Sequence, residues 1–120
     1  MIQFDNVQGK IIRPSDVKVQ IRLKEDSETY VDFATTNQAF QFRFTDRFRN
    51  DFICEYSAQK QKNCTVDGDD STKLNLCLLT KNLKPGTLSL QIGCKQPDAD
   101  FDSGFWHVFK ALEETNLILE

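Results

Sequence analysis

The chain has 120 residues, of which 39% are hydrophobic and 28% charged, with five glycines and three prolines. This composition is ordinary for a soluble globular domain and excludes collagen-like and disordered chains. A chain of this length can bury one hydrophobic core without a metal or a disulfide. We therefore expect a single domain over residues 1–120.

The formal net charge is −3, and acidic and basic residues are interspersed along the chain. This distribution argues against a domain-wide nucleic-acid surface. No apolar run approaches the roughly 20 residues that cross a bilayer, and the first five residues lack the basic-then-apolar order of a signal peptide. We expect no membrane partner, and a protein that stays where it is made or leaves the cell inside a larger assembly.

Strict alternation of apolar and polar residues is the strongest pattern in the chain and predicts half-buried strands. In chain order, it marks residues 17–23, 40–44, 52–56, 74–78 and 88–94. Weaker candidates surround residues 2–4, 11–12, 64–66 and 117–119, and short helical turns are predicted at 79–83 and 109–114. About seven to nine short strands with turns between them predict an all-β fold, a single antiparallel β-sandwich of Ig-like or jelly-roll-like type.

A polar cluster at residues 67–71 separates two of these strands. Gly68 is expected to take a positive φ there, because glycine lacks the Cβ that disfavours this conformation. The cluster therefore predicts a hairpin between residues 64–66 and 73–78.

A second turn is predicted at Pro85 and Gly86. Proline presets φ at the second position of a type II turn, and glycine supplies the positive φ at the third. Farther along, polar residues at 96–98 and 102–104 bracket an expected loop around Phe101.

An aromatic and basic segment spans the second predicted strand and the loop after it. Its members are Phe42, Arg43, Phe44, Arg47, Phe48 and Arg49. Proteins that bind single-stranded nucleic acid use such residues for base stacking and phosphate contact. The alternative is a strand with Phe inward and Arg outward, followed by a polar loop. Asp46 and Asp51 dilute the positive charge and favour the strand, so nucleic acid is not an expected partner.

Residues able to carry catalysis are few. The sole histidine, His107, stands between Trp106 and Val108, a setting typical of a packed or interface histidine rather than a general base. The sequence holds no glycine-rich phosphate loop. We therefore expect no catalytic residue and no cofactor, and the chain is not predicted to be an enzyme.

Asp98, Asp100 and Asp102 alternate along one short stretch. In an extended segment they would share a face, as the carboxylates of a calcium site or a glycosidase pair do. The alternative is a solvated loop, which the adjacent Pro97 favours. We expect no metal site.

Four cysteines stand at positions 54, 64, 77 and 94, without a Cys-x-x-Cys pair. Two disulfides, or glycosylation of Asn63 in the sequence Asn63-Cys64-Thr65, would require a secretory route. Because Cys54 and Cys94 share the apolar face of their strands, we expect free thiols, with these two acting as small core residues.

From residue 51 onward the order of several motifs carries a resemblance. These motifs are Asp51-Phe52-Ile53-Cys54-Glu55-Tyr56, Asn63-Cys64-Thr65-Val66-Asp67-Gly68, Leu83-Lys84-Pro85-Gly86-Thr87-Leu88 and Pro97-Asp98-Ala99-Asp100-Phe101-Asp102-Ser103-Gly104. In this order and spacing, the chain resembles small bacteriophage tail or baseplate proteins, the baseplate-upper-protein N-terminal-like β-sandwich group.

The resemblance implies a non-enzymatic virion protein, made in the bacterial cytoplasm, that assembles with itself and with other phage structural proteins of a tail, baseplate or fibre. The candidate interface is the aromatic cluster Phe101, Phe105, Trp106 and Phe109, expected on a loop, because aromatic residues dominate interface cores. The alternative is that all four fill the core. A second functional hypothesis is a carbohydrate-binding β-sandwich module that uses exposed Trp106 with Tyr30 or Tyr56.

Overall fold

The computed structural model describes residues 2–5, 10–11, 16–23, 28–102, 104–109 and 113–119, of which 2–5, 10–11, 105–106, 108–109 and 113–117 are described by their backbone alone. The described residues form strands and no helix. The strands are β1 (Ile2–Asp5), β2 (Lys10–Ile11), β3 (Asp16–Leu23), β4 (Ala39–Thr45), β5 (Asp51–Tyr56), β6 (Gln61–Lys62), β7 (Cys64–Val66), β8 (Leu74–Leu79), β9 (Gly86–Pro97), β10 (Phe105–Phe109) and β11 (Glu113–Leu119).

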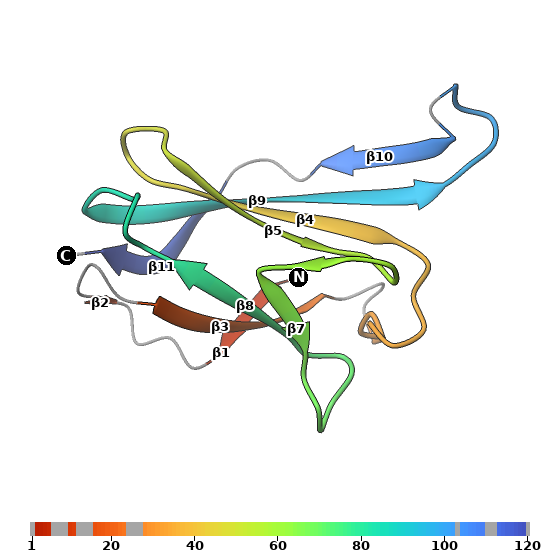
Figure 1. The fold of residues 1–120 in the computed structure, drawn as a ribbon, viewed down its shortest axis with the longest axis horizontal. Coiled ribbons are helices and arrows are strands. Elements are labelled where there is room, and N and C mark those ends of the chain that lie inside the picture. Colours follow the sequence, from red (N-terminus) through yellow and green to blue (C-terminus); the bar gives the residue numbers. More distant parts are fainter. Residues whose placement is uncertain are drawn as a thin grey trace.

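These strands form two sheets, and in Figure 1 β4, β9 and β10 of the second lie above β1 and β3 of the first. The first has the order β1-β3-β8-β7, and the second has the order β2-β11-β9-β4-β5-β6, with β10 also paired to β9. The pairs are antiparallel except for β2 and β11, which run parallel. The predicted all-β fold is therefore confirmed. The described strands outnumber the seven to nine expected, because the two-residue strand β6 and the apolar strand β10 show no alternation pattern.

One buried core joins both sheets. Residues two apart on a strand point to the same face, and the predicted apolar faces of β3, β4, β8 and β9 are the ones that the structure buries. The fully buried side chains include Val19, Ile21, Phe42, Phe44, Leu74, Leu76, Leu78 and Leu88. Each such side chain contributes roughly 1.5–3 kcal/mol by leaving water, so the alternating faces of these strands build the core.

The segment before β4 adds a cap to this core. Phe33 is buried, and its ring lies edge-on to those of Phe40 and Tyr56, with centroids 5.7 and 5.2 Å away. The Phe33 amide donates to the Ser71 carbonyl at 2.9 Å. The buried Tyr56 hydroxyl donates to the Phe33 carbonyl, so its polar atom has a partner.

Asn63 marks a corner between the sheets. It lies between β6, which pairs with β5, and β7, which pairs with β8. Its φ of 57° is positive, a conformation that asparagine adopts more readily than most residues. Its side-chain amide donates to the Ile53 carbonyl at 3.0 Å, and its carbonyl accepts the Cys77 amide at 2.8 Å. This residue thereby ties the two sheets together where one chain segment passes between them.

β9 is the longest strand, with 12 residues, and runs along the second sheet. β4 pairs with one of its edges, while β11 and β10 pair in turn with the first and last parts of the other edge. With β10 it forms an arm that projects beyond the body at the upper right of Figure 1. The expected loop placement of residues 96–97 and 105–109 is therefore wrong, since these residues belong to β9 and β10.

The amino-acid composition of these residues explains why the sequence did not predict them as strands. Apolar residues occupy every position of β10 except 107, so no alternation marks it as a strand. Pro97 is the last residue of β9, where its missing N–H weakens the ladder least.

Two turn predictions have different outcomes. Gly86 has a φ of +128°, as the predicted turn requires, whereas Gly68 is not among the residues with positive φ, so that expectation is wrong. The hairpin between β7 and β8 does form, because the Asp67 carboxylate accepts the amides of Asp69 and Asp70 at 3.3 and 3.2 Å and shapes the turn instead.

The helical turn predicted at 79–83 is also not formed. Leu79 continues β8, and the next residues make a single turn in which the Leu83 amide donates to the Thr80 carbonyl at 3.0 Å. The one predicted at 109–114 has its ends in β10 and β11, and its residues 110–112 lie outside the described residues. No helix within the described ranges has the length and apolarity to cross a membrane.

Candidate functional site

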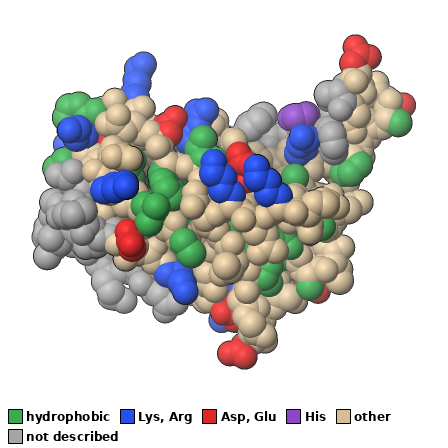
Figure 2. Space-filling view, viewed as in Figure 1, with side chains coloured by type: hydrophobic (Ala, Val, Ile, Leu, Met, Phe, Trp, Pro, Cys, Tyr) green, Lys and Arg blue, Asp and Glu red, His purple; other side chains and the backbone are tan. Residues whose placement is uncertain are grey.

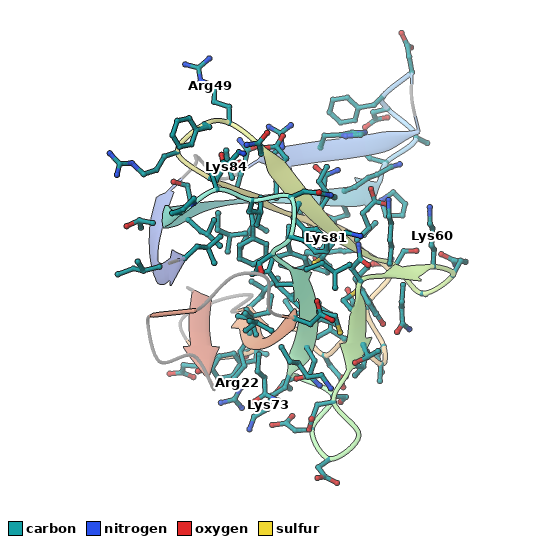
Figure 3. The ribbon with its side chains drawn as sticks, turned by 60° about the vertical axis from the view of Figure 1, so that its left-hand side comes forward. Arg22, Arg49, Lys60, Lys73, Lys81 and Lys84 are labelled. Carbon is teal, nitrogen blue, oxygen red and sulfur yellow. The ribbon has the colours of Figure 1, made fainter. Side chains whose placement is uncertain are left out.

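The loop between β4 and β5, residues 46–50, forms a basic surface that we call the basic tip. Its exposed members are Arg47, Phe48 and Arg49, with Lys84 from the neighbouring loop. Phe48 is 69% exposed, an unusual position for a large apolar side chain. Figure 3 shows Arg49 and Lys84 at the same end of the molecule, far from Arg22 and Lys73. The tip thus presents an apolar ring among three cationic side chains.

Asp46 holds this tip in place. Its side chain is 6% exposed and accepts the amides of Phe48, Asn50 and Lys84 at 2.8, 2.9 and 2.8 Å, and the Asn50 side-chain amide at 2.8 Å. Burial alone would raise the pKa of Asp46, but these donors outweigh it and leave its pKa below the usual value. A buried carboxylate therefore joins the β4–β5 loop to the loop before β9.

Sequence reasoning missed this role, because it treated Asp46 as a charge that dilutes its arginine neighbours. The available signal is local: aspartate after a strand commonly accepts the amides two to four residues on. The same reasoning placed Phe42 and Phe44 in the core, where they are fully buried.

Arg47 packs against the start of β9. Its side-chain carbons lie against Gly86, where any Cβ would collide with them. Beside it is a hollow of about 370 Å³, lined by Asp46, Arg47, Thr87 and Ser89. The hollow offers two hydroxyl groups and the Arg47 guanidinium as hydrogen-bond donors, together with the Asp46 carboxylate, which already accepts backbone amides.

The loop at the other end of β9, described at residues 98–102 and 104, forms a second exposed surface that we call the acidic tip. It carries Asp98, Asp100 and Asp102 around Phe101, which is 47% exposed. In Figure 2, acidic side chains stand at the end of the projecting arm, whereas basic side chains lie over the opposite end and over the middle of this face.

The acidic tip is closed by its own hydrogen bonds. The Asp98 amide donates to the Gly104 carbonyl at 3.0 Å, and the Gly104 amide donates to the Phe101 carbonyl at 2.8 Å. The Asp98 carboxylate accepts the Asp100 amide at 3.0 Å, so it shapes the turn. Across the described residues, no group of three His, Cys, Asp or Glu side chains could hold a metal ion.

Of the four aromatic residues of the predicted interface, the structure describes the side chain of Phe101. Phe101 is exposed, as an interface residue must be, and does not fill the core. Phe105, Trp106 and Phe109 lie in β10 rather than on a loop, opposite Pro97, Gln96 and Gly93 of β9. Their side chains lie outside the described part of the structure, so the choice between core and interface stays a prediction for these three.

A groove of about 400 Å³ runs over the second sheet beside the arm. Polar and charged residues on its walls are Gln41, Glu55, Ser57, Lys60, Lys95 and His107. Sequence reasoning did not anticipate it, because its residues come from four separate strands, β4, β5, β9 and β10, and one connecting loop. His107 is exposed and faces Lys95 across the β9–β10 pair, and is not packed in the core.

The proposed tyrosine platform for a sugar is wrong for Tyr56, which is 4% exposed and belongs to the core. Tyr30 is partly exposed, and the Arg22 guanidinium lies 4.2 Å from its ring centroid. A cation over the ring occupies the face that a sugar would use.

The cysteines are free thiols. Burial raises the pKa of Cys54 to about 12 and that of Cys64 to about 11, so both stay protonated and unreactive at neutral pH. Cys54 lies in the core as predicted, Cys94 is half-buried against it, and Cys64 is a core residue that the sequence analysis did not assign.

The comparisons with known proteins name no relative. The chain matches no protein-family model and no curated protein sequence. The geometry of the two tips and the groove is therefore the basis for a functional proposal.

Proposed function

We propose that this chain is a non-enzymatic structural protein of a bacteriophage virion, which assembles with itself and with other virion proteins to anchor an appendage of the tail, baseplate or fibre. The observation that carries this proposal is the projecting arm with Phe101 exposed at its end. The resemblance of the motifs from residue 51 onward to small tail and baseplate proteins is the reason to propose a phage structural protein.

The arm has the properties of a docking element. The pairing of β4 with β9 ends at Lys95, so among the described residues only β10 pairs with the last two residues of β9, Gln96 and Pro97. Such a two-stranded ribbon is only marginally stable by itself. Its end carries an exposed aromatic side chain, a residue type enriched in protein–protein interfaces. Docking onto a neighbouring protein would bury this ring and support the ribbon.

The proposal is tested on particles. Virions produced from the genome that encodes the chain are purified and labelled with a gold-conjugated antibody against it, and are viewed by electron microscopy. We expect label at one fixed place on each particle. Unlabelled particles, with the chain left behind in the host lysate, would overturn the proposal.

A second test concerns the arm. Light scattering of Trp106→Ala and Phe101→Ser is compared with that of Leu79→Ser, a control at another exposed apolar residue, 39% exposed at the end of β8. We expect both arm variants to stay folded and to lose assembly. An unfolded Trp106→Ala monomer would assign that residue to the core.

One observation favours the alternative of carbohydrate binding. The groove has a volume that suits a small saccharide and is lined by amide, carboxylate and amine groups such as Gln41, Glu55 and Lys60. Binding of the isolated monomer on a glycan array, abolished by Gln41→Ala together with Glu55→Ala, would favour this function over assembly.

A further inference from the structure

We propose that copies of this chain associate head to tail, with the acidic tip of one copy bound to the basic tip of the next. This inference rests on the proposed function, because it specifies how an assembly protein contacts a second copy of itself. The observation behind it is that each end of β9 lies near a loop with an exposed phenylalanine. The loop near its start carries Phe48 and basic side chains, and the loop after its end carries Phe101 and acidic side chains.

The charges of the two tips are complementary. Arg47 and Arg49 flank Phe48 in the chain, with exposed Lys84 on the neighbouring loop, and Asp100 and Asp102 flank Phe101. Asp98 and Asp46 are engaged in hydrogen bonds within their own loops. Opposite charges across an interface steer the partners together and penalise the pairing of like tips.

The apolar parts are complementary as well. Phe48 and Phe101 are two of the three large apolar side chains that are exposed among the described residues. Aromatic pairs at the centre of an interface supply much of its affinity, and surrounding polar groups exclude water. The Arg47 guanidinium at the hollow can pair with a carboxylate of the partner's acidic tip, whereas the Asp46 carboxylate in the same lining is already held by backbone amides of two loops.

The tips of one molecule cannot meet each other. Gly86 packs against Arg47 of the basic tip, and Pro97 directly precedes the acidic tip. Between them the strand rises roughly 36 Å, at about 3.3 Å per residue. Figure 1 shows the two loops at opposite ends of the second sheet. Their complementarity can therefore be satisfied only between molecules, and a contact between two different surfaces repeats to form a ring or a filament.

A second acidic turn lies between β7 and β8 and supplies a natural control. Asp69 is exposed there, but Asp70 pairs with Arg22 at 3.5 Å and no large apolar side chain of the turn is exposed. This turn has acidity without an apolar anchor, so charge reversal at Asp69 should leave association unchanged.

The experiment is sedimentation velocity on the full chain over a range from micromolar to millimolar, because two loop tips bury a small area and bind weakly. Wild type is compared with Phe48→Ser, Phe101→Ser and the control Leu79→Ser, and circular dichroism verifies that each variant is folded. We expect each tip variant, and not the control, to weaken self-association at least about tenfold.

Mixing the two tip variants is the decisive step. Phe48→Ser retains an intact acidic tip and Phe101→Ser an intact basic tip, so their mixture should form a one-to-one dimer and stop there. A second pair reverses the charges: Arg47→Glu with Arg49→Glu, and Asp100→Lys with Asp102→Lys. Each should fail to associate alone, the two reversals combined in one chain should restore association, and Asp69→Lys should behave as wild type.

The possible failures are distinct. If only the Phe101 variants matter and the mixture stays monomeric, the arms bind like to like, and the inference is wrong while the proposed function stands. If wild type is monomeric throughout, head-to-tail association and the self-assembling part of the proposed function both fail. Association that is unaffected by 0.5 M salt and by the charge reversals would also overturn the inference, since screening must weaken it.

Discussion

The two tips at the ends of β9 have loops of similar length but different support. A buried carboxylate, Asp46, holds the basic tip through donors from two separate loops. Among the described residues of the acidic tip, the hydrogen bonds join residues 98–102 and 104 to one another. In the proposed head-to-tail contact, the basic tip would therefore be the preorganised side and the acidic tip the more adaptable one.

The largest expected effect on stability comes from replacing the aspartate that shapes each tip, Asp46 or Asp98. Asp46→Ala should lower the free energy of unfolding by about 2–4 kcal/mol, because it leaves several amides without their acceptor in a buried site. Asp98→Ala should cost less than about 1 kcal/mol, because water can replace an exposed carboxylate. Urea unfolding of the two variants measures the difference, and equal losses would contradict the distinction between the tips.

A matched pair of glycines gives the second test. Gly86 and Gly104 both have positive φ, at 128° and 80°, but a Cβ meets Arg47 only at Gly86. Gly86→Ala should cost about 2 kcal/mol or more, from backbone strain and the displacement of Arg47. Gly104→Ala should cost about 1 kcal/mol, from strain alone. Thermal unfolding provides the measurement, and a larger effect at Gly104 would reverse the order of rigidity.

The pH dependence of stability provides a smaller effect. The pKa of Asp46 is lower in the folded protein than its usual value of 3.8, so its contribution to stability is complete above that value and disappears as the pH falls through the folded pKa. Asp46→Asn should therefore flatten the acid limb of a plot of unfolding free energy against pH. The pKa of Asp70 is also lowered, mainly by hydrogen bonds from Thr72. The unfolding free energy of Asp46→Asn should therefore still fall slightly at acid pH. An unchanged limb in Asp46→Asn would contradict the assigned role.

The smallest effect concerns Arg49, whose φ of 66° is unfavourable for a residue with a Cβ. Arg49→Gly should relieve this strain and stabilise the fold by up to about 1 kcal/mol, while it removes one charge from the basic tip. Chemical denaturation would detect the gain. A loss of stability would mean that the Arg49 side chain supports the loop.

The sequence predicted the strands whose faces alternate, and their core residues lie where expected, because burial on one face imposes a period of two. It could not predict β10, whose apolar run has no period, or the role of Asp46, which depends on the Lys84 amide 38 residues away. Tyr56 was misassigned for a related reason: tyrosine suits both a core and a surface, and only the position of the Phe33 carbonyl decides between them. The position of Phe101 on an exposed loop could be predicted from the polar residues around it, whereas its role in an interface stays a prediction.

The length of β9 has a mechanical consequence for any molecule held at both tips. The basic tip follows β4 and the acidic tip follows β9, so tension applied between them would pass from one strand to the other. It would load the seven residue pairs between β4 and β9 in shear, so that their perpendicular hydrogen bonds would have to break together rather than one at a time. A string of such molecules would behave as a stiff tether, whose weakest points are the contacts between copies.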